Sequence, residues 1–305
     1  MQIFRHFPEH PTAPAALAIG NFDGVHLGHQ AILHRLAEVA EKQRLACSLL
    51  TFEPHPREFF APDKAPARLA SMREKLEQFA EHGVAQAYVC HFDAAFAAMG
   101  VEAFIEQILR RSLDVRCVLV GQDFRFGAGR AGSVDDLRAA GIAVESLPDV
   151  TVDGVRVSST AVRQALAAGD LAQAKRLLGR DYSISGHVVH GDKLGRILGY
   201  PTANVQMQHD RPPLSGIYAV KLSGLETGDQ PGVASLGVRP TMKQNGAPTL
   251  EVHLFDFDRD IYGQHVRVRF LHKLRDEAKF PDMETLKQQI AADELAARDY
   301  FKTTT

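Results

Sequence analysis

The first half of the chain alternates between strand-like and helix-like segments, and this alternation limits the folds open to it. Five short apolar runs, typical of buried strands, are separated by longer segments in which apolar residues recur at helical spacing. The strand-like runs are Ala15–Ile19, Leu45–Phe52, Val84–Cys90, Val115–Val120 and Ile142–Leu147. Strands that alternate with helices form βαβ units, so we expect an α/β fold with a parallel sheet covered on both faces.

Helices are expected between and after these strands. The first begins near Leu27, and two others are predicted over Ser71–His82 and Val101–Ser112. Two shorter helices, Thr160–Ala168 and Asp170–Leu178, close this half of the chain.

Beyond Gly179 the pattern changes to short, alternating strand candidates with Gly and Pro between them. This pattern indicates an antiparallel barrel or sandwich, followed by a helix from Asp282 to about Tyr300. We therefore expect two domains, residues 1–180 and 181–305. The strand candidates are Tyr182–Val189, Gly216–Leu222, Gly232–Leu236, Thr249–Phe255 and His265–Leu271.

Composition excludes several classes of partner. Lys and Arg number 35 against 37 Asp and Glu, so the net charge of -2 supplies no broad positive field for nucleic acid or acidic lipid.

The first residues lack the build of a signal peptide, and no apolar run approaches the roughly 18 residues that span a bilayer. Cys47, Cys90 and Cys117 are interpreted as core thiols of a cytoplasmic protein. The oligomeric state cannot be read from the sequence.

A glycine turn and two histidines follow the first predicted strand. The segment Gly20–His29 reads GNFDGVHLGH and leads into a helix, so His26 and His29 project from the first helical turn. Free backbone N–H groups at such a terminus, together with two imidazoles, favour an anionic phosphate. Gly28 leaves room for a nucleotide to approach the backbone. The alternative is that the histidines are only partly exposed polar residues.

Two further segments of the first half carry phosphate-binding chemistry. Ser158, Ser159 and Thr160 enter a predicted helix, with Arg163 one turn on, and this set could clamp a triphosphate. The alternative is that one hydroxyl is simply the helix cap. The loop Gly121–Gly127 follows a strand, and ligands of parallel sheets sit outside the carboxyl ends of strands.

A second candidate site lies in the second half. The segment 191–199 has glycines at every fourth position and two basic residues, which suits a loop folded over polyphosphate, although it is not a Walker A sequence. Alternation places Thr202 and Asn204 on one strand face, where their oxygens could hold a hard cation such as Mg²⁺. Glu251 alternates with apolar residues, and this pattern alone indicates an ordinary outward carboxylate.

The chain resembles the bacterial bifunctional riboflavin kinase/FMN adenylyltransferase (FAD synthetase) family. In the first half the resemblance rests on Gly20–His29, Gly121–Gly127 and Ser158–Arg163. It implies a Rossmann-like nucleotidyltransferase domain in which His26 and His29 act on the ATP phosphates, with Thr51–Pro56 near the flavin. The nucleotide-binding residues that it implies are Gly20, Asn21, Phe22, Gly24, Gly28, Asp123, Ser158, Ser159, Thr160 and Arg163.

In the second half the resemblance is to the riboflavin kinase domain, a barrel with a terminal helix. It implies that Glu251 is the general base on the ribityl 5′-hydroxyl, that Thr202 and Asn204 hold Mg-ATP, and that Arg275 lies on a flavin-side lid. The nucleotide-binding residues that it implies are Gly191, Lys193, Gly195, Arg196, Gly199, Pro201 and Thr202.

The resemblance implies two successive reactions: ATP phosphorylates riboflavin to FMN, and a second ATP adenylylates FMN to FAD with release of pyrophosphate. Two alternatives stay open at this point. The chain could be an adenylyl- or cytidylyltransferase for another phosphate ester, or a flavin-binding regulator without turnover. An acidic run at Asp256, Asp258 and Asp260 mimics an EF-hand, but its sixth position is Ile261 rather than Gly, so we expect a solvated turn.

Overall fold

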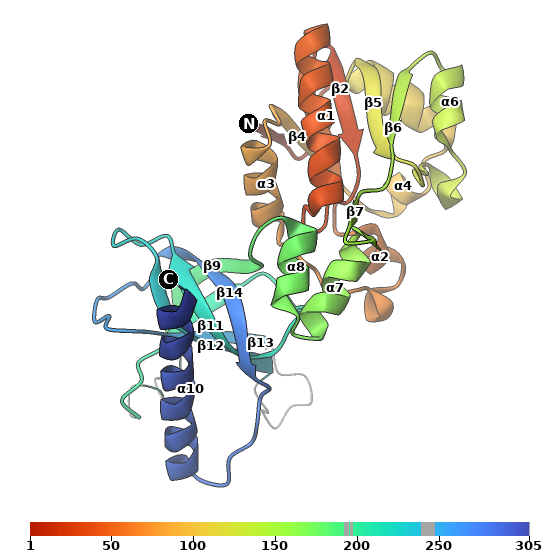
Figure 1. Ribbon diagram of the computed structural model, residues 1–305. Helices are drawn as coiled ribbons and strands as arrows, with labels where there is room; N and C mark the ends of the chain where they lie inside the picture. The colour runs from red at the N-terminus through yellow and green to blue at the C-terminus, as the bar shows by residue number, and fades with distance from the viewer. Residues whose placement is uncertain (192–194, 196–197, 239–247, 305) are drawn as a thin grey trace. The chain divides into compact units, whose positions relative to one another are not determined.

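The computed structural model describes residues 1–191, 195, 198–238 and 248–304 (Figure 1). By packing, the chain divides into two compact units. The first comprises residues 1–66 and 72–158, and the second comprises residues 67–71 and 159–305.

The first unit contains the expected parallel sheet. Its six strands are ordered β1-β4-β3-β2-β5-β6, and every pair of neighbours is parallel. Strand order reverses beside the central strand β2, because β3 lies on one side and β5 on the other, and such a switch point is where ligands of open α/β sheets bind. The strands are β1 Gln2–Phe4, β2 Ala15–Ile19, β3 Ala46–Glu53, β4 Gln86–His91, β5 Val115–Gly121 and β6 Ala143–Leu147; a separate hairpin pairs β7 Thr151–Val152 with β8 Val155–Arg156.

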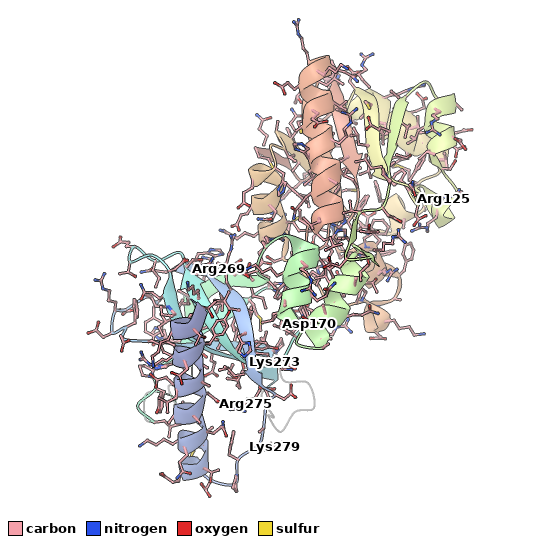
Figure 2. The ribbon with its side chains drawn as sticks, viewed as in Figure 1. Arg125, Asp170, Arg269, Lys273, Arg275 and Lys279 are labelled. Carbon is pink, nitrogen blue, oxygen red and sulfur yellow. The ribbon has the colours of Figure 1, made fainter. Side chains whose placement is uncertain are left out.

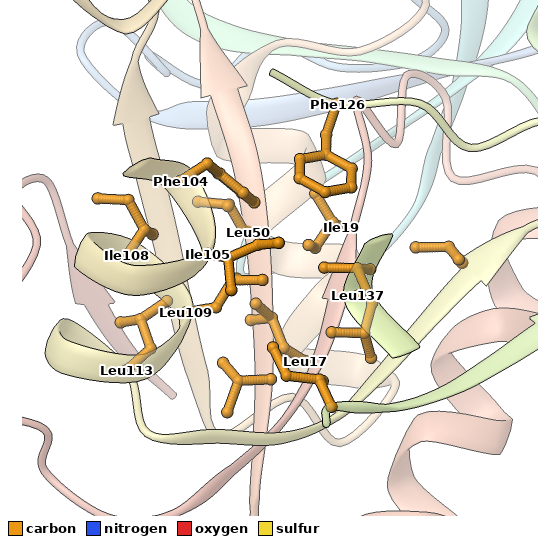
Figure 3. Packing of buried hydrophobic residues seen from close by; sticks show 14 of the residues in the cluster. Leu17, Ile19, Leu50, Phe104, Ile105, Ile108, Leu109, Leu113, Phe126 and Leu137 are labelled. Atoms are coloured by element: carbon orange, nitrogen blue, oxygen red, sulfur yellow. The ribbon is translucent and has the colours of Figure 1, made fainter. Parts of the chain in front are cut away.

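Helices cover both faces of this sheet. One core cluster joins α1 and α3 to it, and the other joins η2 and α6 to the opposite face (Figure 3). All five residues of β2 are buried, which is the burial that a strand covered on both faces requires. The helices are α1 Leu27–Gln43, α2 Pro56–Phe60, η1 Pro62–Lys64, α3 Met72–Glu81, α4 Ala94–Ala97, α5 Val101–Ala103, η2 Phe104–Ser112, η3 Ala128–Arg130 and α6 Val134–Ala139.

One helix differs from its prediction. The segment Val101–Ser112 is not one α-helix: α5 is short, and η2 continues it as a π-helix. The wider turn still buries the apolar face, because Phe104, Ile105, Ile108 and Leu109 all pack into the core (Figure 3). Periodicity predicts the buried face here but not the hydrogen-bond pattern.

The second unit contains the expected antiparallel barrel. Its strands close in the order β10-β13-β12-β11-β14-β9, and inward residues alternate with outward ones, as in β13, where Leu250, Val252 and Leu254 are buried. The strands are β9 Ser183–Val189, β10 Ala203–Met207, β11 Gly216–Ser223, β12 Gln230–Val238, β13 Pro248–Leu254 and β14 His265–Arg275; the helices of the unit are α7 Ser159–Ala167, α8 Leu171–Leu178 and α10 Met283–Thr304.

Helices α7 and α8 pack within the second unit. Helix α8 begins at its N-cap Asp170 and contacts β14, and the backbone of Gly169 lies against the Lys273 side chain. The predicted boundary between residues 180 and 181 lies after these two helices, and it stays a prediction.

Candidate active sites

The loop after β2 is held in a conformation that few residues adopt. Phe22, Gly24 and Val25 have φ angles of 49°, 80° and 40°, of which only the glycine value is unstrained. The Phe22 ring is buried and meets the ring of Phe79 on α3 edge-on, at 5.6 Å between centroids. Tertiary packing therefore fixes this loop at the carboxyl end of the central strand.

The two histidines come together at the start of α1. The His26 and His29 rings are stacked, with centroids 3.6 Å apart and planes 17° from parallel. His26 is the N-cap: its Nδ1 accepts a hydrogen bond from the His29 backbone N–H at 3.3 Å. Because Nδ1 accepts, the neutral ring carries its proton on Nε2, which is a hydrogen-bond donor.

Gly28 allows this stacking. A Cβ at position 28 would lie 3.2 Å from His26 Nδ1 and 3.7 Å from the Val157 carbonyl oxygen. The glycine therefore lets the His26 ring lie against the first turn of the helix. Gly20 meets a similar constraint, because a Cβ there would lie 3.2 Å from the Phe22 ring.

A lysine that sequence reasoning missed supports the same loop. Lys75, on α3, is only 5% exposed, and its Nζ donates to the Asn21 carbonyl oxygen at 3.2 Å. Thr51 Oγ1 at the end of β3 donates to the same carbonyl at 3.2 Å, while the side-chain oxygen of Asn21 is buried without a hydrogen-bond partner among the described residues. No local pattern could reveal Lys75, because it lies 54 residues from Asn21.

Beside this loop the first unit has a cavity of about 660 Å³ with a largely aromatic wall. Consecutive rings are in contact, for example Phe104 with Phe126 at 5.3 Å and Phe52 with Phe96 at 5.8 Å. Gly20 and Asn21 also line the cavity, as does Pro56 of the predicted flavin-side segment. Four basic residues line it too: Arg57, Lys64, Arg125 and Arg130.

The remaining predicted residues of the first site lie as follows. Asp123 lines the same cavity, and its carboxylate accepts from Arg156 at 3.0 Å. Ser158 ends the first unit, whereas Ser159 and Thr160 begin α7 in the second. Arg163 also lies on α7, where its Nε donates to the Ala67 carbonyl at 2.6 Å.

In the barrel, Thr202, Asn204 and Glu251 come together. Glu251 of β13 is opposite Asn204 of β10 in the strand register, and Thr202 Oγ1 lies 3.4 Å from Glu251 Oε2. Glu251 faces outward between buried neighbours, as the alternation predicted. A hydroxyl, an amide and a carboxylate thus share one face of the barrel.

Two described glycines of the glycine-rich segment lie close to this group. A Cβ on Gly191 would lie 2.5 Å from the Asn204 side-chain carbon, and one on Gly195 would lie 3.3 Å from Thr202 Oγ1. Gly199 has a φ of 88°. The predicted basic residues of this segment, Lys193 and Arg196, lie outside the described residues.

A smaller cavity of about 180 Å³ adjoins the group. Pro201 and Thr202 line one side, and residues 257–262 line the other. The Tyr262 ring lies against the His190 ring, with centroids 3.9 Å apart and planes tilted by 42°. Asp256, Asp258 and Asp260 are exposed in the connection between β13 and β14, so the predicted solvated turn is confirmed.

Arg275 lies at the end of β14, where its guanidinium pairs with Asp293 of α10. Sequence reasoning placed Arg275 on the flavin side but did not find this partner, which lies 18 residues further along the chain.

Other groups bear on the chemistry only indirectly. The three cysteines are buried and reduced, and burial raises the pKa of the Cys90 thiol to about 12. Among the described residues there is no cluster of three or more His, Cys, Asp or Glu side chains placed to hold a metal ion. In the same part of the chain, no helix has the length and apolarity to cross a membrane.

Stacked imidazoles at a helix N-terminus, and a carboxylate beside a hydroxyl and an amide, are arrangements typical of enzymes that transfer phosphate groups. Family models assign each half: residues 9–161 match FAD synthetase, and residues 178–301 match riboflavin kinase. The chain belongs to the family of bifunctional riboflavin kinase/FMN adenylyltransferases. It phosphorylates riboflavin to FMN and adenylylates FMN to FAD, with ATP as co-substrate of both steps.

Individual relatives agree over nearly the whole chain. The bifunctional riboflavin kinase/FMN adenylyltransferase of Escherichia coli (strain K12) is 48% identical, over 96% of this chain and 95% of its own. The protein with the same description from Haemophilus influenzae is 45% identical, over 99% and 100%. A solved structure from Streptococcus pneumoniae, described as a macrolide-efflux protein, has a TM-score of 0.82 at 29% identity, over 98% of this chain and 99% of that one. The two alternatives left open by the sequence are thereby decided in favour of the bifunctional enzyme.

Proposed function

We propose that the two reactions occur at two independent sites, one in each half of the chain. AMP transfer takes place in a domain of residues 1–180 at the His26–His29 pair, and riboflavin phosphorylation takes place in a domain of residues 181–305 at Glu251. The observation that carries this proposal is that each half has its own geometry suited to phosphate: stacked imidazoles at a helix N-terminus in one, and Gly191 and Gly195 close to the Asn204 and Thr202 side chains in the other.

At the first site AMP transfer needs no protein nucleophile. An oxygen of the FMN phosphate attacks the α-phosphorus of ATP in line, the bond to the bridging oxygen breaks, and pyrophosphate leaves. His26 and His29 donate to the phosphate oxygens as charge develops on them, which lowers the barrier by preorganised electrostatics. Lys75 and Thr51 hold the Asn21 loop, which precedes the two histidines, in place through the Asn21 carbonyl.

The nucleotide at this site is held by the turn after β2, by Asp123 and by the segment Ser158–Arg163. The nucleotide lies close to the protein backbone at the turn residues Gly20, Asn21, Phe22, Gly24 and Gly28. Asp123 contacts the nucleotide, and the hydroxyls of Ser158, Ser159 and Thr160 with Arg163 close over the phosphates. Support comes from the helix N-terminus that these hydroxyls enter, which favours anions.

The aromatic cavity receives FMN. Its volume of about 660 Å³ and its wall of phenylalanine rings suit a planar ring system that stacks on them. The basic residues on the same wall suit the phosphate that distinguishes FMN from riboflavin. This division predicts that the unit binds FMN more tightly than riboflavin, which titration of flavin fluorescence measures.

At the second site Glu251 removes the proton from the ribityl 5′-hydroxyl, whose oxygen then attacks the γ-phosphorus of ATP. The bond from the γ-phosphorus to the β–γ bridging oxygen breaks, and ADP leaves. The segment with Gly191, Lys193, Gly195, Arg196 and Gly199 covers the polyphosphate. Pro201 and Thr202 border the cavity in which the nucleotide lies, and Arg275 faces the flavin. Deprotonation by a positioned carboxylate contributes roughly 10²- to 10⁴-fold to such reactions.

The residues present also fit a magnesium ion. Thr202 and Asn204 present a hydroxyl and an amide oxygen on the face that Glu251 shares, and Mg²⁺ prefers such oxygens together with substrate phosphates. When bound, the ion would neutralise charge on the phosphates. Thr202 and Asn204 would hold it, and Glu251 would keep its proton-accepting role beside it.

The partners we propose are the small molecules riboflavin, FMN and ATP, rather than nucleic acid or membrane. The net charge of -2 supports this choice, and the three buried, reduced cysteines support a cytoplasmic location. Fractionation of cells that express the tagged protein tests the location.

The direct test of the function is a time course. The pure protein is incubated with riboflavin, ATP and MgCl₂, and the flavins are separated by chromatography. FMN should appear first and FAD later, and EDTA should stop both steps. Riboflavin that stays bound and unchanged would contradict both proposed reactions.

A further inference from the structure

A buried carboxylate on the terminal helix organises the end of β14. Arg275 Nε lies 2.9 and 3.1 Å from the two carboxylate oxygens of Asp293, and Arg275 Nη2 lies 2.7 Å from Oδ2. This is the forked geometry in which arginine binds a carboxylate most strongly. Figure 2 labels Arg275 beside helix α10. Asp293 is only 6% exposed, so the pair is largely removed from water.

The arrangement is built on more than one ion pair. Gln289, one turn earlier on α10, donates to Asp293 Oδ1 at 3.0 Å. The third guanidinium nitrogen, Nη1, donates to the Asp276 carbonyl at 2.9 Å, and the guanidinium also lies over the Phe280 ring at 5.5 Å. A single guanidinium thus binds both helix α10 and the segment 276–280, which lies between the end of β14 and this helix.

That segment reaches the face of the barrel that carries Glu251. The Glu277 carboxylate occupies the space that a side chain on Gly237 would need, and burial raises the pKa of this carboxyl. Strands β12 and β13 pair so that Gly237 is opposite Thr249. Two residues along each strand, Ser235 is opposite Glu251. Because residues two apart in a strand share a face, Glu277 lies over the same face as Glu251.

The pairing also leaves part of the guanidinium available. Of the five N–H donors of arginine, one on Nε, one on Nη2 and one on Nη1 make the bonds described above. Within the described part of the chain, Nη1 and Nη2 each keep a second N–H outside these bonds, in a direction that the fork with Asp293 fixes.

We propose that Asp293 is a positioning residue of the riboflavin kinase reaction. It holds the Arg275 guanidinium and, through it, the segment 276–280, so that the flavin side of the kinase site is formed before substrate binds. This inference rests on the kinase function and on the proposed placement of riboflavin beside Glu251. Loss of the Asp293 charge should raise the KM for riboflavin, because binding must then order both Arg275 and the segment.

Two other ion pairs on the same helix are far more exposed. Arg298 binds Asp256, whose side chain is 80% exposed, and Asp299 pairs with Lys302 where both side chains are exposed. Exposed pairs of this kind contribute little to stability. Asp299→Asn is therefore a matched control on α10 for Asp293→Asn.

The experiment measures both activities of the full chain for Asp293→Asn, Asp293→Glu, Gln289→Ala and Asp299→Asn. We expect Asp293→Asn to raise the KM for riboflavin at least tenfold while the KM for ATP and AMP transfer to added FMN stay within twofold of the parent. Asp293→Glu, which restores the charge, should recover part of the loss. Asp299→Asn should change neither activity.

Two results would overturn the proposal: a riboflavin KM within twofold of the parent in Asp293→Asn, or an equal rise in the KM for both kinase substrates.

Should Asp293→Asn fail to fold, Gln289→Ala decides, because it removes only the 3.0 Å bond to Asp293 from a half-buried position. A two- to fivefold rise in the riboflavin KM alone supports the proposal, and no change contradicts it. Glu251→Gln, assayed in parallel, tests the catalytic base separately, so failure of either assignment is recognisable.

Discussion

Replacing Gly191 by alanine should damage the kinase without unfolding the protein. The new Cβ would lie 2.5 Å from the Asn204 side-chain carbon, whereas ordinary contact begins at 3.4 Å. Either the glycine segment or the Asn204 amide must therefore move by about 1 Å. Gly191 has no positive φ, so alanine can adopt its backbone conformation. Either movement changes how the glycine and the Asn204 amide lie against each other.

The size of the effect follows from this displacement. A misplacement of about 1 Å at a reacting centre can cost roughly 10²-fold in rate, equivalent to about 2.7 kcal/mol of transition-state stabilisation. The lower entropy of the unfolded chain gives a glycine-to-alanine change about 0.4–1 kcal/mol at an allowed backbone conformation, which offsets part of the cost of the displaced contact, so the melting temperature should change little. Gly191→Ala should therefore separate kinase activity from stability.

The assay is the initial rate of FMN formation from riboflavin over a range of ATP concentrations, with AMP transfer to added FMN as the internal reference. The control is Gly100→Ala, because a Cβ there meets nothing within 4 Å. Kinase kcat/KM should fall roughly 10²-fold in Gly191→Ala only, while AMP transfer is unchanged. Parental kinase kcat/KM in Gly191→Ala would refute the reasoning.

Three further predictions concern the proposed chemistry. His29→Ala should lower AMP transfer roughly 10²- to 10³-fold, because one donor to the phosphates is lost, while the kinase rate persists; equal loss of both activities would contradict separate sites. Glu251→Gln should lower the kinase rate roughly 10²- to 10⁴-fold and spare AMP transfer, and full kinase turnover would remove Glu251 as the base. Lys75→Met should lower AMP transfer roughly tenfold or more, because it removes a charged donor to the Asn21 carbonyl, and unchanged AMP transfer with Lys75→Met would show that the loop needs no such support.

The elements of both halves could be predicted because their periodicity is strong. Alternating strands and helices led to the parallel sheet, and the outward position of Glu251 in β13 followed from period-two alternation. The π-helix η2 could not be predicted, because its buried residues have the same spacing as those of an α-helix. Periodicity reports which face is buried rather than which carbonyl each N–H meets.

The site residues divide in the same way. His26 and His29 could be found because a helix N-terminus after a strand has a local signature, and the structure shows their rings stacked. Lys75 and Asp293 could not be found, because each acts through a partner that only tertiary packing brings near. The aromatic cavity is a similar case, since its rings come from segments as far apart as Phe52 and Phe126.

The central claim is that two sites work independently within one chain, and a mixing experiment tests it most directly. His29→Ala and Glu251→Gln are each incubated with riboflavin, ATP and MgCl₂, alone and as a 1:1 mixture, and FAD is measured. Alone, the first should stop at FMN and the second should leave riboflavin unchanged. The mixture should form FAD, because FMN released by one variant is adenylylated by the other. A mixture that makes no FAD, although each variant keeps its remaining activity, would contradict independent sites.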